Sequence, residues 1–93
     1  MTVVNIASHT PTPNDQYIGR GNILGNPFKI GIDGDRQEVI KKYEEYAKER
    51  LSWDETFKRA ILACEGKTLI CFCKPLSCHG DVIEMLIEEY KEN

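Results

Sequence analysis

Residues 68–73 read Thr-Leu-Ile-Cys-Phe-Cys, a short run that is almost entirely apolar. A strand with one face in water alternates polar and apolar residues, whereas a run without alternation is typical of a strand buried on both faces. We therefore predict a central β-strand over residues 68–73. Helical segments precede and follow it, and helical connections between strands favour parallel pairing with a right-handed crossover.

The N-terminal third supplies the other strand candidates. Residues 2–6 (TVVNI) are short and β-branched and predict a strand, and Tyr17 and Ile18 predict a brief second one. The segment 8–15 between them contains two prolines and several turn formers, which indicates a loop. Residues 20–27 contain two glycines and two asparagines, so we expect an irregular but ordered segment there.

Three helices are predicted after residue 34. Asp35 with Glu38, and Ser52 with Glu55, fit capping boxes that begin the first two helices. Gly66 fits the residue that follows the second helix. Apolar residues recur at helical spacing in all three, namely Val39, Ile40, Tyr43, Tyr46, Ala47 and Leu51 in the first, Trp53, Phe57, Ala60, Ile61 and Cys64 in the second, and Val82, Ile83, Leu86, Ile87 and Tyr90 in the third.

These elements predict an α/β fold, with a short, mainly parallel sheet packed with about three helices. The 93 residues are enough for one domain, so residues 1–93 are expected to form a single α/β domain. No apolar run approaches the roughly 18–20 residues that span a bilayer, and the first residues do not resemble a signal peptide. We therefore expect a cytoplasmic protein with no membrane partner.

The net charge of −3 argues against an extended nucleic-acid surface, which should be basic. Most of the acidic residues lie in the predicted helices. A local pocket for an anion remains compatible with this charge, because four basic residues flank the candidate site or its strand, namely Arg20, Lys29, Lys67 and Lys74.

All four cysteines lie within fifteen consecutive residues, at positions 64, 71, 73 and 78. Disulfides of small secreted proteins are usually spread along the chain, so we interpret these residues as thiols, metal ligands or redox groups. Cys64 and Cys71 are expected to pack in the core as small apolar residues. Cys73 and Cys78 flank the turn between the central strand and the last helix, which makes them the candidates for chemistry.

One interpretation of this turn is thiol chemistry by Cys73 or Cys78, assisted by His79 or Asp81. With Ser77 as the N-cap, Cys78 would lie in the first helical turn, where unpaired N–H groups and the helix dipole favour a thiolate or a bound anion. Adjacent helical residues point about 100° apart, so His79 is expected to be a poor partner for Cys78 and a better one for Cys73. Asp81 could cap the helix or orient His79.

Two alternatives remain open for the same turn. Cys71, Cys73, Cys78 and His79 could bind zinc, although the spacing is unusual for a zinc site, so no cofactor is expected and zinc is the alternative. The helix start could instead bind an anion without any reaction. In the strand order expected here, the end of the central strand and the end of the first strand lie at the same edge of the sheet, where ligands of such folds bind.

The segment YIGRGNILGNPF, residues 17–28, is the second candidate for ligand binding. Glycines allow a close approach of the backbone to a ligand, and arginine can bind a phosphate or carboxylate with two hydrogen bonds. We expect the ligand contacts at Arg20, Gly21, Gly25 and Asn26, together with Ser77. The alternative is a packed loop with Phe28 as its anchor. His9, near the end of the first strand, is expected to be structural or solvated.

Three segments together resemble a known family. These are YIGRGNILGNPF, the Arg-x-Glu-Val-Ile-x-x-Tyr pattern of residues 36–43, and LICFCKPLSCHGDV, residues 69–82. They are similar, in this order, to the uncharacterised family named domain of unknown function four-three-two-six, which occurs in microbes and their viruses and has no assigned reaction. Phe72 stands where the family often has Trp. The Cys-His segment is also similar to the end of another uncharacterised family, which has Arg at the position of Gly80.

From these features we predict a protein that binds an anionic small molecule, such as a nucleotide or a nucleotide derivative, with thiol-assisted chemistry as an option. The alternatives are a metal-stabilised accessory module and a ligand-sequestering phage protein. Because the chain is short, a homodimer is one way in which its pocket could be completed.

Overall fold

The central strand of the sheet is β3 (Thr68–Cys71). β1 (Thr2–Asn5) and β2 (Asp15–Tyr17) flank it in the order β1-β3-β2, and both pair with it in parallel. Leu69, Ile70 and Cys71 are all buried, so both faces of the strand are covered. The predicted central strand and the parallel pairing are therefore confirmed, although β3 ends at Cys71 and not at residue 73.

The computed structural model describes residues 2–19, 21–72, 76 and 78–92. Within these residues the chain forms three α-helices and a three-stranded sheet, which confirms the predicted α/β class. Three predicted site residues, Arg20, Cys73 and Ser77, lie outside the described residues. In that part of the chain, no helix is long and apolar enough to cross a membrane.

The first helix, α1 (Arg36–Leu51), begins as predicted. The Asp35 carboxylate accepts a hydrogen bond from the Glu38 N–H, and the Glu38 side chain accepts one from the Asp35 N–H, which completes the capping box. Four residues of its apolar stripe are buried, namely Val39, Tyr43, Ala47 and Leu51. The helix therefore contributes one continuous face to the core.

The second helix, α2 (Glu55–Leu62), begins later than predicted. Its N-cap is Asp54, whose carboxylate accepts from the Phe57 N–H, whereas Ser52 is the C-cap of α1. Because residues 52–54 connect two helices, Trp53 is 70% exposed and does not join the α2 face. Gly66 adopts the expected left-handed backbone, with φ +79°, but it lies beyond the C-cap of α2 in the following turn.

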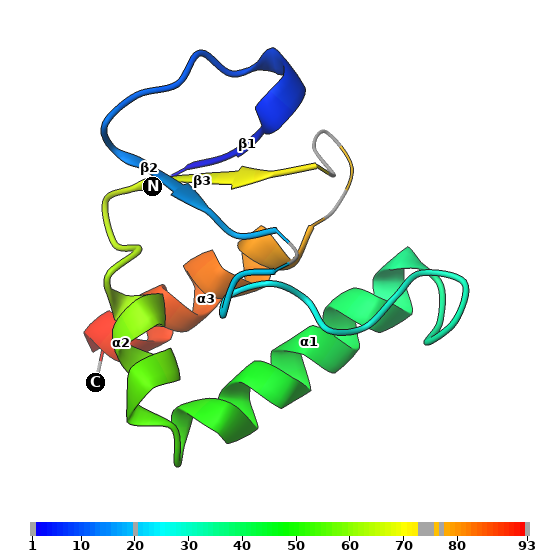
Figure 1. Cartoon of the computed structure of the whole chain (residues 1–93). Coiled ribbons are helices and arrows are strands. Elements are labelled where there is room, and N and C mark those ends of the chain that lie inside the picture. Colours follow the sequence, from blue (N-terminus) through cyan, green and yellow to red (C-terminus); the bar gives the residue numbers. More distant parts are fainter. Residues whose placement is uncertain (1, 20, 73–75, 77, 93) are drawn as a thin grey trace.

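The last helix, α3 (His79–Glu92), runs beneath the sheet, and α1 and α2 lie on the same side (Figure 1). The segment 6–14, which begins with a 3-10 turn (Ile6–Ser8), arcs over the opposite side of the sheet. One apolar core joins the sheet to the three α-helices. Its residues include Val3 and Leu69 from the sheet, Tyr43 from α1, Phe57 from α2 and Ile83 from α3.

The loop between β2 and α1 is ordered by side chains that bond to its own backbone. Asn22 accepts from the Leu24 N–H, Asn26 from the Phe28 N–H, and Asp33 from the Lys29 N–H. Such turns compete well with regular structure when asparagine and aspartate are frequent. The prediction of an irregular but ordered segment is confirmed for the residues of this loop that the structure describes.

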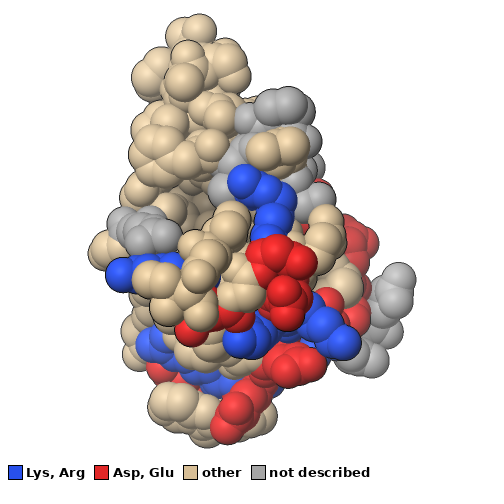
Figure 2. Space-filling view, turned by 90° about the vertical axis from the view of Figure 1, so that its right-hand side faces the viewer, with Lys and Arg blue, Asp and Glu red and all other residues tan. Residues whose placement is uncertain are grey.

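On one face of the molecule, charged side chains gather over the helical part. On the face shown in Figure 2, basic and acidic side chains are interspersed over the lower, helical part, and the upper part carries few of them. Neither sign forms a continuous area on that face. The absence of an extended nucleic-acid surface stays a prediction from the net charge.

Candidate active site

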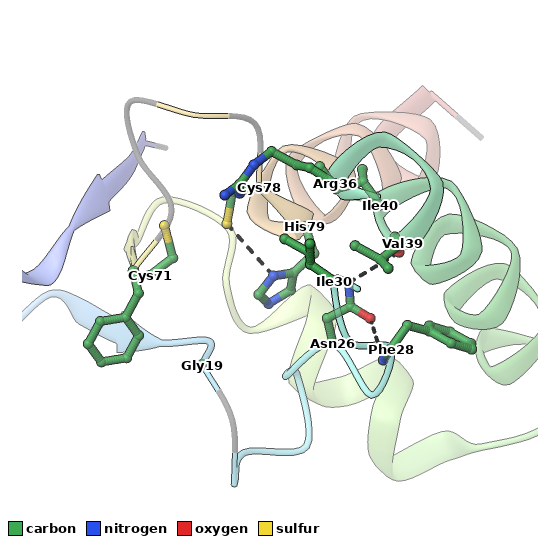
Figure 3. A pocket seen from close by; sticks show the side chains of 11 residues that line it. Gly19, Asn26, Phe28, Ile30, Arg36, Val39, Ile40, Cys71, Cys78 and His79 are labelled. Carbon is green, nitrogen blue, oxygen red and sulfur yellow. Dashed lines mark hydrogen bonds between the residues drawn. The ribbon is translucent and has the colours of Figure 1, made fainter. Parts of the chain in front are cut away.

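A pocket of about 260 Å³ lies at the edge of the sheet where β2 and β3 end. Cys71 is the last residue of β3, Gly19 follows β2, and the start of α3 closes the same side. Figure 3 shows the labelled side chains around this space. The described lining residues are Gly19, Asn26, Phe28, Ile30, Arg36, Val39, Ile40, Cys71, Phe72, Cys78 and His79.

Cys78 occupies the position directly before α3, which begins at His79. Its carbonyl accepts from the Asp81 N–H at 3.0 Å, and its own N–H donates to the Asp81 carboxylate at 3.3 Å. The Gly80 N–H points to the Cys78 sulfur at 3.4 Å. Cys78 is therefore at the N-cap position. The prediction that took Ser77 as the cap, and so placed Cys78 in the first helical turn, is wrong. The predicted capping role of Asp81 is observed.

The Cys78 sulfur lies 3.7 Å from Nδ1 of His79 (Figure 3). The prediction that these neighbours would be poor partners is wrong. It assumed that both residues have helical backbone, which would separate their side chains by about 100°. Only His79 is in the helix, so the side chain of Cys78 is free of that constraint and turns toward the imidazole.

The other ring nitrogen of His79 fixes the protonation of the ring. Nε2 lies 2.7 Å from the carbonyl oxygen of Ile18. A carbonyl oxygen can only accept, so Nε2 carries the proton, and in the neutral ring Nδ1 is left as an acceptor facing the Cys78 sulfur. Burial lowers the pKa of His79, and the hydrogen bond to Ile18 opposes this shift in part. The neutral imidazole therefore presents its unprotonated nitrogen, Nδ1, to the Cys78 thiol.

The imidazole is held in place from a second direction by α1. The ring of Tyr43 packs edge-on against it, with 4.9 Å between the ring centroids. The Tyr43 hydroxyl donates to the carbonyl of Leu24 at 2.8 Å, which ties the helix to the loop after β2. Burial raises the pKa of Tyr43 well above its usual value. Tyr43 therefore remains a neutral donor, and it orients His79 by packing.

Gly80 allows the start of α3 to lie close to the sheet. A Cβ atom at this position would be 2.8 Å from Val3 Cγ1 and 2.9 Å from Ile18 Cδ1. Real Cβ atoms almost never approach so closely, so with any side chain here either the start of α3 or the side chains of Val3 and Ile18 would have to shift. The glycine therefore keeps the Ile18 carbonyl within reach of His79, and an arginine at this position would not fit this packing.

Arg36 is a lining residue that our sequence analysis did not select. Figure 3 shows its side chain extending from the start of α1 toward the Cys78 side of the pocket. A signal for it was present, because Arg36 is the first residue of α1, directly after the cap. A cation in this position is unfavourable for the helix dipole, by about 0.3–1 kcal/mol. Such a placement indicates a role outside the helix itself.

The predicted ligand residues of the Gly/Arg loop serve the packing of the loop in several places. A Cβ atom on Gly25 would lie 2.6 Å from the Gly19 carbonyl oxygen, so these two backbones are in close contact. Asn26 lines the pocket, but its side chain donates to the Val39 carbonyl and accepts from the Phe28 N–H. Gly21 is exposed, with φ +84°. Ligand contacts by Gly21, Gly25 and Asn26 stay a prediction.

The three described cysteines are all buried, each about 1% exposed, and they differ in their contacts. Cys64 is buried in the core, where its thiol donates to the Ala60 carbonyl, and burial raises its pKa to about 11. Cys71 is also buried, as predicted, but it lines the pocket. Among the described residues, no cluster of three or more His, Cys, Asp and Glu side chains is placed to hold a metal. Because Cys73 lies outside them, the zinc alternative stays open.

The side-chain contact of His9 is with Asp15 and not with a residue of the pocket. Its Nε2 lies 2.9 Å from the Asp15 carboxylate, which also accepts from the hydroxyl and the N–H of Thr12. These bonds lower the pKa of Asp15, with the Thr12 backbone as the largest favourable cause. They close the segment before β2, so the structural reading of His9 agrees with its contacts.

The fold and the site define a small α/β protein with a Cys-His pair in a pocket at the edge of a parallel sheet. The family model described as Domain of unknown function (DUF4326) matches residues 4–89. The chain therefore belongs to this family, and the resemblance seen in its motifs is confirmed. It is also similar to the uncharacterised 12.4 kDa protein of the nrdA-td intergenic region of Enterobacteria phage T4. The two are 34% identical over 74 residues, which cover 78% of this chain and 67% of the phage protein. No solved structure matches the chain.

Proposed function

We propose that the protein binds a small anionic molecule, with a nucleotide or nucleotide derivative as the candidate, and acts on it with the thiol of Cys78. The observation that carries this proposal is the chain of contacts from the Cys78 sulfur to His79 Nδ1, and from His79 Nε2 to the Ile18 carbonyl. A nucleophile, a base and a group that orients the base are the three parts of an activated thiol site.

The Cys-His pair supports a defined proton transfer. The neutral His79 can take the Cys78 proton on Nδ1 as the sulfur forms a bond to an electrophilic carbon of the ligand. The electrons of the bond that breaks stay on the leaving group, and Nδ1 returns the proton to it. The Gly80 N–H at 3.4 Å from the sulfur stabilises negative charge there while the bond forms.

The charge of the pocket supports an anionic ligand. Of the described residues that line it, Arg36 is the one with a permanent charge, and no carboxylate is among them. Guanidinium groups bind phosphate and carboxylate groups through paired N–H donors. Around Arg36 the lining is largely apolar, with Phe28, Val39 and Ile40, and in such surroundings a charge acts more strongly than in water.

The size of the pocket limits the ligand. Pockets for drug-sized molecules are roughly 300–1,000 Å³, and this one, at about 260 Å³, is smaller than that range. A dinucleotide cofactor would extend far outside this volume, and a mononucleotide is the largest ligand that we consider for it. We therefore restrict the proposal to small ligands.

The test separates binding from chemistry with three variants. We expect Arg36→Gln to weaken the binding of adenosine 5′-monophosphate, measured by calorimetry, by about 10- to 100-fold, as for a lost charge-assisted hydrogen bond. Arg59→Gln, on the exposed face of α2, is the matched control and should bind like the wild type. Cys78→Ser should keep binding and lose covalent reactivity. Equal binding by Arg36→Gln and the wild type would contradict the anion site.

If Cys78→Ser binds as the wild type does and no covalent product of any ligand is found with the wild type, the pocket is a binding module. If wild-type protein binds neither inorganic phosphate nor a mononucleotide, the proposed ligand class is wrong. Thermal melting of each variant identifies a loss of binding that results from unfolding.

A further inference from the structure

The side chain of Phe72 is exposed, and packing within the fold does not explain why a large aromatic residue occupies this position. The residue follows the last position of β3, and its side chain is 64% exposed although it lines the pocket. Leu69, Ile70 and Cys71, the preceding residues of the strand, are buried. A large aromatic side chain left in water loses most of the stabilisation that its burial would give, so packing does not explain its presence at the pocket mouth.

The ring of Phe72 is nevertheless held in a defined place. The ring of Tyr17 meets it edge-on, at 6.1 Å between centroids and an interplanar angle of 85°. The side-chain amide of Asn5 donates to the Phe72 carbonyl at 3.2 Å, which fixes its backbone against the end of β1. The strands β1 and β2 thus each supply one contact that positions this exposed ring.

Gly19 makes room for this arrangement. A Cβ atom at position 19 would lie 2.1 Å from the Tyr17 hydroxyl and 2.3 Å from the carbon that bears it. Tyr17 can therefore lie over the backbone of residue 19, and from there support Phe72, only because that residue is a glycine. Gly19 is itself buried and lines the pocket, so the support is built into the pocket wall.

We propose that Phe72 is the stacking platform for a planar ring of the ligand, and that the substrate class of this site is therefore the mononucleotides. A heteroaromatic base stacks on an exposed aromatic face and gains affinity without needing specific hydrogen bonds. Arg36, which lines the same pocket, supplies the partner for the phosphate. Sugar phosphates and aliphatic acids have the anion but lack the ring. This inference rests on the proposed function and names the ligand part that Phe72 selects.

The experiment measures how ligands protect Cys78 from alkylation. The rate of iodoacetamide labelling of Cys78, read by peptide mass spectrometry, is followed against the concentration of each of four probes: adenosine and uridine 5′-monophosphates, ribose 5-phosphate and adenosine. The variants are Phe72→Trp and Phe72→Leu. Each rate is compared with that of the same variant without a probe, so that any shielding of the thiol by residue 72 itself cancels.

We expect both monophosphates to protect at concentrations about 5- to 100-fold lower than ribose 5-phosphate, the range that stacking of one base provides. Phe72→Trp should keep this difference, and Phe72→Leu should reduce it to less than about 3-fold. Because residue 72 is exposed, both variants should melt like the wild type.

Equal protection by ribose 5-phosphate and the monophosphates overturns the platform but leaves the anion site in place. An unchanged preference in Phe72→Leu overturns the role of Phe72. If Cys78 labels no faster than Cys64, the proposed thiol chemistry fails instead. Calorimetry with the same probes and variants then tests separately whether the ligand base stacks on Phe72. If no probe binds by either method, the platform and the proposed ligand class are both wrong.

Discussion

The imidazole of His79 connects two parts of the chain that are distant in the sequence, because its Nε2 lies 2.7 Å from the carbonyl of Ile18, the residue directly after β2, 61 residues away. This single bond determines which nitrogen faces the Cys78 sulfur. The reactivity of the thiol therefore depends on the packing of α3 against the sheet, and variants can test this dependence without knowledge of the natural substrate.

The first prediction concerns the order in which the cysteines react. At near-neutral pH, iodoacetamide should label Cys78 before Cys64 and Cys71, because Cys78 has a base at 3.7 Å and lines the pocket. With a pKa of about 11 against an ordinary 9.0, Cys64 has about 100-fold less thiolate than an exposed cysteine. Peptide mass spectrometry gives the order, and Cys73, which lies outside the described residues, is measured beside it. Labelling led by Cys64, or equal at every cysteine, would place the site elsewhere.

The second prediction assigns the base. In His79→Gln the amide nitrogen can still donate to the Ile18 carbonyl, but the basic nitrogen Nδ1 is lost and the amide oxygen is too weak a base to take the thiol proton. Alkylation of Cys78 should slow by about tenfold or more in the neutral range, since the proton has no local base. His9→Gln is the control, because its imidazole pairs with Asp15 and not with a thiol. A rate that is unchanged in His79→Gln would remove the base from the mechanism.

The third prediction follows from the lowered pKa of His79. In the unfolded chain this histidine binds a proton near its ordinary pKa of 6.5, whereas the folded protein binds it only at lower pH. The unfolded state therefore binds more protons in this window, and the free energy of unfolding falls as the pH drops below about 6.5. The melting temperature of the wild type should decrease more between pH 7.5 and pH 5 than that of His79→Gln. Parallel decreases would mean that His79 is not buried in its neutral form.

The fourth prediction concerns Gly80. In Gly80→Ala the new Cβ would collide with Val3 and Ile18, so the free energy of unfolding should fall by about 1–3 kcal/mol, as in an overpacked core. Because Ile18 must move, the alkylation of Cys78 should slow as well. Gly66→Ala is the control, since its Cβ would meet no atom within 4 Å and only the left-handed backbone is strained. If both variants lose stability but Cys78 is alkylated at the wild-type rate in both, the packing of Gly80 does not control the Cys78–His79 pair.

The fifth prediction concerns metal. The protein is expected to hold less than about half an equivalent of zinc or iron, because the spacing of its cysteines is unusual for a closed tetrahedral site. Cys71, Cys78 and His79 line one pocket, but the described residues place no three such side chains to hold a metal, and Cys73 lies outside them. Metal analysis with native mass spectrometry on untagged protein decides between this expectation and the zinc alternative. Near-stoichiometric metal, together with unfolding by a chelator, would favour the metal-stabilised module.

Much of the fold was predictable because its signals are local. The almost entirely apolar run at residues 68–73 predicted a buried central strand, of which residues 68–71 form β3, and the Asp35 and Glu38 pair predicted the start of α1. Both depend on contacts within a few residues or on burial alone. The start of α2 was predicted wrongly because Ser52 and Asp54 both fit a cap, and the helix uses Asp54, whose carboxylate accepts from the Phe57 N–H.

The sequence by itself determined which residue types surround the candidate site. The Cys-His pair, the glycines and the aromatic residue at the end of the strand are all visible in the chain, and so is their order. It could not predict that Cys78 would turn toward His79. That contact depends on a helix that begins one residue later than expected, which in turn depends on the cap formed by Asp81.

Only the tertiary structure decided the rest of the site. Arg36 and Phe72 are 36 residues apart in the chain, and they line one pocket because the fold brings the first residue of α1 and the residue after β3 to the same space. The Ile18 carbonyl could not be identified from its residue type, since every residue has the same carbonyl group and only its position gives it a role. The sequence specifies the chemistry of the side chains. The packing of the helices and strands selects the main-chain groups that orient those side chains.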